Sequence, residues 1–245
     1  MKADPGIQQK LLLVQEIDIR VRQLTHRLQS LPQNAPLAEL AARDAAVRAR
    51  RADAVGTVET VRIELARLES DVATVQARQK RDAERLQATS SVKDVAALET
   101  ELEALAIRLT ELEDLELTAM EKVEDAERAL ANLDEERAAI EQQVIALTAE
   151  RSGTAAAIEA ERSTLVADRE AKAATIPADL AALYEARRVR GDGVGAALLQ
   201  HQGCKGCTMV LTGSDLEVVR RAASDDVLFC PECDRILIRT VESGL

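Results

Sequence analysis

The chain has 245 residues, of which 47% are hydrophobic and 31% are charged, but it contains one tyrosine, one phenylalanine and no tryptophan. This composition is typical of long helices and coiled coils, and its apolar content is too high for a disordered charged chain. The net charge of −11 disfavours the bulk, charge-driven wrapping of nucleic acid that strongly basic proteins show.

Neither a membrane span nor a secretion signal is visible. The N-terminal residues carry no apolar core of the required length, and no run approaches the roughly 20 apolar residues of a transmembrane helix. We therefore expect a cytoplasmic protein that has no membrane partner. In that compartment, four cysteines are more typical of metal ligands than of disulfides.

The first predicted helix covers residues 7–30. Apolar residues recur every seven positions at two seam positions, which hold Ile7, Val14, Val21 and Leu28, and Ile17, Leu24 and Leu31. This heptad spacing predicts a left-handed coiled coil. Pro32 and Pro36 then predict a break, because proline lacks an amide proton and restricts the residue before it.

Two longer helices follow, over residues 37–88 and 92–172, both with apolar residues in steps of three and four. Ser91 and Asp94 form a capping-box pattern at the start of the third helix. The connection near 88–91 is short, and residues 37–88 match residues 92–143 in length. We therefore predict an antiparallel hairpin, with residues 7–30 packed beside 150–172. A parallel dimer is the alternative, and a homodimer of hairpins is left open.

Residues 1–175 form this predicted coiled-coil rod, and residues 176–245 form a second, β-rich unit. Ile176-Pro177 ends the rod, and apolar spacing predicts a short helix from residue 178. A glycine cluster then predicts a hinge: Gly191, Gly193 and Gly195. The fold class is therefore mainly α, a coiled-coil hairpin with a small C-terminal head.

Four cysteines of the head form two pairs, Cys204 with Cys207 and Cys230 with Cys233. Each CxxC pair bends into a tight turn that directs two sulfurs at one ion, so two such pairs predict a zinc site with four thiolate ligands. The head has few apolar residues, so we expect it to need one structural Zn²⁺ in order to fold. A redox CxxC is the competing interpretation, but such a motif occurs singly. His201 is interpreted as a surface residue.

Between and after the cysteine pairs, residues 208–211, 226–229 and 235–239 predict strands. Ser214 and Glu217 predict a capping box that starts a short helix through residue 221. Phe229 is expected to fill the small core. Gly206 is expected to ease the first turn. Asp234 stands where glycine is common, and Asp tolerates the left-handed backbone conformation better than most residues.

The chain resembles a family of bacterial coiled-coil proteins with a C-terminal four-cysteine zinc ribbon. The resemblance covers essentially the whole chain and is carried by the segments LLLVQEID, SSVKDVAALETEL, IPADLAALYEARR, GVGAALL, CKGC and CPECDRIL. It implies a coiled-coil hairpin with a zinc-ribbon head. It also implies a role in nucleic-acid binding or in the regulation of gene expression.

Two non-enzymatic functions follow as hypotheses. In the first, basic residues of the head bind RNA or DNA phosphates: Arg187, Arg188, Arg190, Lys205, Arg220, Arg221, Arg235 and Arg239. Against it, acidic residues outnumber basic residues over 177–245, and four thiolates with one zinc ion add about −2. In the second, the chain is a protein-interaction scaffold or chaperone-like adaptor that binds a protein partner through the coiled coil. We expect no enzymatic activity, because no nucleophile and base can be matched and a four-thiolate site leaves no ligand position for water.

Overall fold

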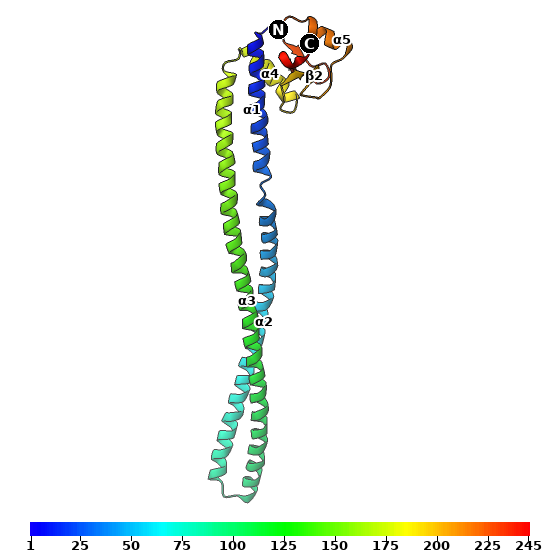
Figure 1. The fold of residues 1–245 in the computed structure, drawn as a ribbon. Coiled ribbons are helices and arrows are strands. Elements are labelled where there is room, and N and C mark those ends of the chain that lie inside the picture. Colours follow the sequence, from blue (N-terminus) through cyan, green and yellow to red (C-terminus); the bar gives the residue numbers. More distant parts are fainter. The chain divides into compact units, whose positions relative to one another are not determined.

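The computed structural model describes residues 1–245. Four helices come first: α1 (Pro5–Gln29), α2 (Asn34–Ala88), α3 (Val92–Ala173) and α4 (Ala178–Arg190). Short elements follow: β1 (Ala196–Gln200), β2 (Gly203–Cys204), α5 (Gly213–Arg221), β3 (Leu228–Phe229), β4 (Ile236–Ile238) and the 3-10 helix η1 (Val241–Ser243). The chain divides into two compact units, one formed by residues 35–148 and one formed by residues 1–34 and 149–245 (Figure 1).

Residues 35–148 form an antiparallel hairpin of α2 and the first part of α3. Ion pairs join the two arms, from Arg51 to Asp134 at 2.6 Å and from Arg78 to Glu101 at 2.6 Å. The later residue of α2 pairs with the earlier residue of α3, as an antiparallel arrangement requires. Seam residues pack between the arms, namely Leu40, Val47, Leu133 and Ile140. The predicted hairpin is confirmed.

Two helix starts differ slightly from the predicted ones. α1 begins at Pro5 because Asp4 caps it, its carboxylate accepting hydrogen bonds from the amides of Gly6 and Ile7. α2 begins at Asn34, so Pro36 lies in its first turn and only Pro32 falls in the break. A first-turn proline is tolerated there, because the amide that it lacks would have no partner within the helix.

In the other unit, α1 packs against the C-terminal part of α3, as predicted for residues 7–30 and 150–172. Leu24, Leu31 and Ile158 are buried together. The guanidinium of Arg20 lies 2.7 Å from the carboxylate of Glu161, on the exposed side of this contact. The same face of α1 continues past this seam toward the strands of the head.

The head is built on a four-stranded sheet with the order β2-β1-β4-β3. β1 and β4 are parallel neighbours in the centre, and β2 and β3 pair with them in antiparallel fashion. β1 was not predicted. Residues 208–211 were predicted as a strand but make only one bridge, from Val210 to Gly203.

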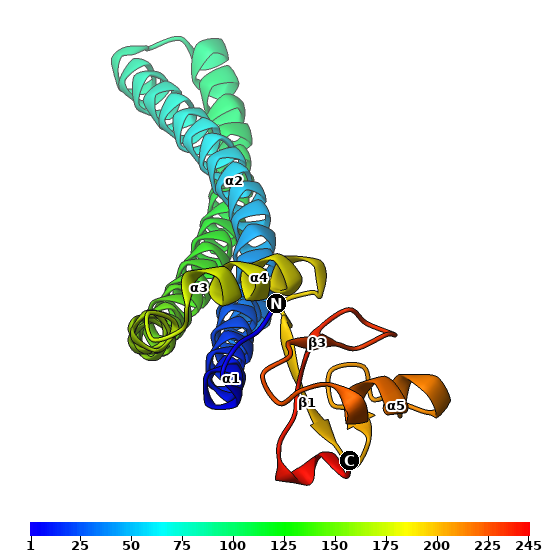
Figure 2. The same cartoon turned by 90° about the horizontal axis from the view of Figure 1, so that it is seen from above.

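The two central strands, β1 and β4, contribute residues to two separate apolar clusters. One face of the sheet, with Ala196, Ile236 and Ile238, packs against α1 and α4. The other face, with Ala197, Leu199 and Leu237, packs against α5 and the cysteines. Successive residues of a strand point to opposite faces, so β1 and β4 contribute to both clusters and lie between them. In Figure 2, β1 leads away from α1 and α4 into the part of the head that carries α5.

Residues 1–3 pair with residues 225–227, the segment just before β3, through an isolated antiparallel bridge from Lys2 to Asp226. The amide of Ala3 donates to the carbonyl of Asp225 at 2.8 Å, and the amide of Val227 donates to the carbonyl of Met1 at 3.1 Å. The ammonium of Lys2 lies 2.9 Å from the carboxylate of Asp225. The N-terminal segment is therefore anchored to the head.

Two local predictions for the head were wrong. α5 starts at Gly213 with Thr212 as its N-cap, and no side chain caps it, so the capping box of Ser214 and Glu217 does not form. Phe229 is 37% exposed and does not fill the core. Its neighbour Leu228 packs against the cluster around the cysteines in its place.

Candidate metal centre

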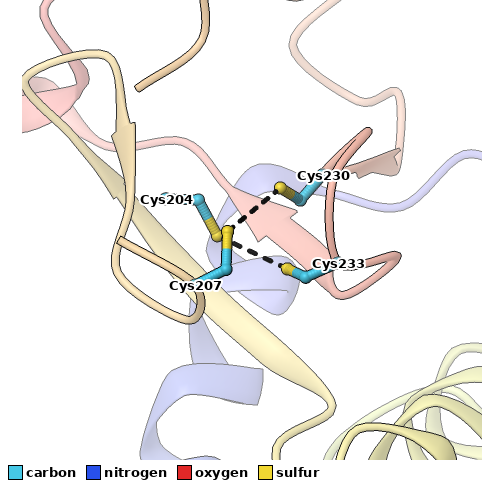
Figure 3. A group of neighbouring side chains, drawn as sticks. All are labelled: Cys204, Cys207, Cys230 and Cys233. Carbon is cyan, nitrogen blue, oxygen red and sulfur yellow. Dashed lines mark hydrogen bonds between the residues drawn. The ribbon is translucent and has the colours of Figure 1, made fainter. Parts of the chain in front are cut away.

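The four cysteines converge on one point, with all four sulfur atoms within 4.8 Å of one another (Figure 3). The sulfur of Cys204 lies 3.8 Å from that of Cys233, and the sulfur of Cys207 lies 3.7 Å from that of Cys230. A disulfide would require about 2.05 Å, whereas sulfurs at about 2.3 Å around a tetrahedral ion stand about 3.8 Å apart. The observed separations therefore fit a metal site with four thiolate ligands.

The backbone folds each cysteine pair into the same turn. In the first pair, the amide of Thr208 donates to the carbonyl of Cys204 at 2.7 Å. In the second, the amide of Asp234 donates to the carbonyl of Cys230 at 2.9 Å. The amides of Cys204 and Cys230 in turn donate to the carbonyls of Met209 and Arg235, both at 2.9 Å. We call these two turns the first and the second knuckle.

Both knuckles end in a left-handed residue. Asp234 has a φ of 59°, which agrees with the conformation expected for it from the sequence. Thr208 has a φ of 64°, although threonine is β-branched and rarely adopts this conformation. Thr208 was not predicted as a residue of this kind, although it directly follows the second cysteine of its CxxC pair, as Asp234 does.

Gly206 has a different role from the one predicted. Its backbone is not left-handed, so no turn conformation demands glycine there. Instead, a Cβ atom at this position would stand 2.8 Å from the Cδ of Arg235 and 2.9 Å from the Cβ of Ala197. Glycine is needed because these side chains cross the first knuckle at close range.

The surroundings of three of the thiols shift their pKa values in different directions. Burial raises the pKa of Cys204 to about 12, and burial also raises the pKa of Cys230. Burial acts in the same direction on Cys233, but hydrogen bonds from Arg235 and from neighbouring thiols hold the pKa of Cys233 below its ordinary value. A metal ion must therefore displace protons from Cys204 and Cys230 in order to bind.

Four sulfur donors also limit which ion fits. Thiolates select soft or borderline ions such as Zn²⁺ over Mg²⁺ and Ca²⁺, which prefer oxygen. His201 is exposed and lies outside the cysteine group. The chemistry of the donors therefore suits zinc, which these four cysteines alone would hold.

Two of the predicted nucleic-acid contacts are occupied by the backbone of the head. The guanidinium of Arg235 donates to the carbonyls of Gly191, Val194 and Gly206 at 2.9–3.1 Å. The guanidinium of Arg239 donates to carbonyls at the C-terminal end of α5 and just beyond it, including those of Ala222 and Asp226. Both arginines are partly buried.

Most of the other basic residues have acidic partners. Arg187 pairs with Asp234 and lies over the ring of Phe229, 4.6 Å from its centroid. Arg188 pairs with Glu185 at 2.8 Å, and both Arg220 and Arg221 pair with Glu217. Arg190 and Lys205 are exposed and have no acidic partner within 4 Å. The structure therefore does not bring the eight basic side chains together on one face.

A buried polar group attaches the head to α1. The side-chain oxygen of Gln15 accepts hydrogen bonds from the amides of Gly195 at 2.7 Å and Ala196 at 3.3 Å, and its amide nitrogen donates to the carbonyl of Gly193 at 3.0 Å. The hydroxyl of Tyr184 donates to the carboxylate of Asp18 at 2.6 Å. Burial, then this bond, raises the pKa of Tyr184 well above its ordinary value. This group could not be predicted from the sequence, because nothing distinguishes Gln15 there from other polar residues between seam positions.

This combination of elements defines the class of protein as a coiled-coil hairpin carrying a C4-type zinc ribbon. Residues 14–192 match the model of the CT398-like coiled coil hairpin domain, and residues 204–237 match that of the C4-type zinc ribbon domain. The chain belongs to the family of CT398-like coiled-coil hairpin proteins. None of its helices combines the length and apolar character that a membrane crossing requires.

Relatives resemble the chain over nearly its whole length. Uncharacterized proteins of Mycobacterium tuberculosis are 32% identical over 98% of this chain and 98% of their own. A solved structure from Mycobacterium smegmatis is 29% identical, has a TM-score of 0.86, and covers 98% of this chain and 100% of its own. The structure of CT398 from Chlamydia trachomatis shares the fold at 22% identity, with a TM-score of 0.64 over 95% of this chain and 97% of its own.

Proposed function

We propose that the protein is a non-enzymatic cytoplasmic adaptor that binds a protein partner, and that one structural Zn²⁺ holds its head in shape. The observation that carries the proposal is the contrast between the two candidate sites of the head. The cysteines converge on one centre, whereas the basic residues are dispersed and mostly engaged within the chain.

The metal part of the proposal rests on the cysteine geometry. Cys204, Cys207, Cys230 and Cys233 would fill all four positions of a tetrahedral ion and leave none for water or substrate. A zinc ion bound in this way supplies folding free energy and no catalytic chemistry. Measurement of about one zinc per chain by elemental analysis of the purified protein supports this part, and a full chain that is folded without bound metal contradicts it.

The choice of a protein partner rests on charge. RNA or DNA binding requires several free cationic groups on one face, because each phosphate contact contributes part of the affinity. Of the eight candidates, only Arg190 and Lys205 are exposed and without an acidic partner. Bringing the other six to phosphates would break contacts that the head already makes. Nucleic-acid binding is therefore the hypothesis that the test must exclude.

The test measures fluorescence anisotropy of labelled single-stranded RNA and double-stranded DNA with the zinc-loaded full chain. We expect no binding at physiological salt. Binding that weakens steeply between 50 and 200 mM salt, and that is lost in the double variant Arg190→Ala with Lys205→Ala, would overturn the choice of a protein partner. A double variant at Arg43 and Arg67, exposed residues of α2 without an acidic partner, is the control for a general loss of positive charge.

A further inference from the structure

Arg235 is the first residue beyond the second knuckle, yet its side chain reaches the first knuckle. The terminal nitrogens of its guanidinium donate to the carbonyl of Gly206 at 2.9 Å and to that of Gly191 at 3.0 Å, and its Nε donates to that of Val194 at 3.1 Å. Gly206 lies between Cys204 and Cys207, so one hydrogen bond of this arginine holds the first knuckle directly.

The backbone of Arg235 closes the second knuckle. Its carbonyl accepts the hydrogen bond from the amide of Cys230 at 2.9 Å. Arg235 is thus a single residue whose main chain closes one knuckle and whose side chain holds the other.

The surrounding residues leave space for this arrangement. Any side chain at position 206 would collide with the Cδ of Arg235, since even a Cβ atom would stand 2.8 Å from it. The three acceptors are carbonyls of two separate segments, the connection from α4 to β1 and the first knuckle, and a planar guanidinium presents its donors in a fixed fork that can meet all three. A lysine ammonium is a point charge on a flexible stem and does not reproduce that fork.

We propose that Arg235 is a positioning residue of the metal centre, which clamps the first knuckle against the second and holds the four sulfurs at ligating separation. This inference rests on the proposed structural zinc site. It follows from the geometry that a site without the clamp must spend binding free energy on bringing the two knuckles together. The positive charge of the guanidinium also lies near a centre that carries about −2 when zinc is bound to four thiolates.

The test compares Arg235→Lys with Arg239→Lys in the full chain. Arg239 is the matched control, because it also donates to several backbone carbonyls of the head, but those carbonyls lie around α5 and not on a knuckle. Zinc affinity is measured by competition with a chromogenic chelator. We expect Arg235→Lys to lower the affinity about 10–100-fold, as loss of an outer partner of a metal ligand does, and Arg239→Lys to change it less than about threefold.

A spectroscopic readout separates positioning from general stability. With Co²⁺ as the probe, we expect saturated Arg239→Lys to keep the wild-type tetrahedral absorption bands, and Arg235→Lys to show altered ones, because its sulfurs are less well held. Equal affinities in the two variants and the wild type, or equal losses in both variants, would overturn the inference. A wild-type chain that binds neither Zn²⁺ nor Co²⁺ would instead overturn the zinc site itself.

A second pair of variants keeps Arg235 and fills the space that its side chain occupies beside the first knuckle. Gly206→Ala places a methyl group against the Cδ of Arg235, whereas the atom nearest to a methyl group at Gly203 is the carbonyl oxygen of Gln200, at 3.3 Å. We expect Gly206→Ala to lower zinc affinity in the same range as Arg235→Lys, and Gly203→Ala to have little effect. Gly206→Ala with wild-type affinity would contradict the clamp even if Arg235→Lys failed to fold.

Discussion

Gln15 is a polar residue that is 4% exposed, on a helix face where its neighbours are apolar. Its side chain meets the backbone of residues 193–196, the segment that leads from α4 into β1. Unlike an apolar contact, these hydrogen bonds specify one position of that segment against α1. The glycines before β1, which predicted a hinge from sequence, are thus held by a side chain that is far away in sequence.

We predict that Gln15→Leu destabilises the head by about 1–3 kcal/mol, because it leaves buried backbone groups of Gly193 and Gly195 without partners. Urea unfolding followed by the fluorescence of Tyr184, the single tyrosine, measures this change beside the mutated residue. Gln9→Leu, on the exposed face of α1, is the control and should change the free energy of unfolding by less than about 0.5 kcal/mol. Equal stability of Gln15→Leu and the wild type would show that the hydrogen bonds contribute nothing.

The left-handed residues of the knuckles give a second prediction. Thr208→Gly should stabilise the zinc-loaded head by about 1 kcal/mol, because glycine adopts a positive φ without the cost that threonine bears. Asp234→Gly should gain less, since it also removes the ion pair with Arg187. The thermal midpoint of the head in both variants measures the difference, and a lower midpoint for Thr208→Gly than for Asp234→Gly would contradict it.

At the scale of elements, a buried carboxylate interrupts the apolar seam of the α2–α3 hairpin near the connection between the two helices. Asp82 is 7% exposed and occupies the side of α2 that faces α3, where it pairs with Arg85 at 3.2 Å and Arg78 at 3.7 Å. The two arms enclose an open groove of about 830 Å³ there, lined by these residues and by Asp94, Leu98 and Glu101. A carboxylate in place of an apolar residue weakens the seam.

Asp82→Leu should therefore raise the thermal stability of the hairpin, by about 1–2 kcal/mol, because it replaces a buried charge with apolar contact. Its two arginine partners are largely exposed, so neither is left buried without a partner. The thermal midpoint by circular dichroism measures the change, with Glu84→Leu on the exposed face as the control. A lower midpoint for Asp82→Leu than for the wild type would mean that the ion pairs outweigh the seam contact.

The long helices could be predicted from the sequence more accurately than the short strands. Heptad spacing repeats many times along α1, α2 and α3, so helix bounds were predicted to within three residues. β1 has five residues and β3 has two, too few for alternation to show, and adjacent Ala196 and Ala197 are both buried because both faces of the sheet are covered. The strands at 228–229 and 236–238 were recognised from their apolar residues, but the side on which Phe229 lies was not.

In the candidate site, the metal ligands could be predicted from the sequence, but the residues that support them could not. The four cysteines were identified from spacing alone, because the chemistry of a tetrahedral ion fixes which residues and separations can serve it. Arg235 and Arg239 were taken as phosphate contacts, and their internal roles were invisible in the sequence. Their acceptors are backbone carbonyls, which every residue carries and which only the fold brings together.

At the scale of the whole molecule, the metal should control one compact unit and leave the other intact. Because β1 and β4 carry apolar residues to both the cysteine cluster and the α1–α4 cluster, loss of metal from one face should loosen the other. We predict that zinc removal by a chelator increases hydrogen exchange in β1, β4, α4 and the first half of α1. Exchange in residues 35–148 should not change.

Mass spectrometry of peptides after deuterium labelling, with and without zinc, measures this prediction. A chain with Cys204→Ser and Cys230→Ser provides the control that cannot regain the ion. Faster exchange confined to residues 203–235 would show that the two faces of the sheet are independent. Faster exchange along α2 would show that the metal acts on the whole chain.

The anchoring of residues 1–3 beside residues 225–227 has a consequence for synthesis on the ribosome. At about 5–20 residues per second, roughly 11–45 s separate the translation of these two segments. For most of that interval Leu11 and Val14, which are buried in the finished protein, have none of their partners from α4, β1 or β4, because α4 begins only at Ala178. α1 is therefore made long before the residues that complete its apolar cluster, and Leu11 and Val14 are open to chaperones during that time.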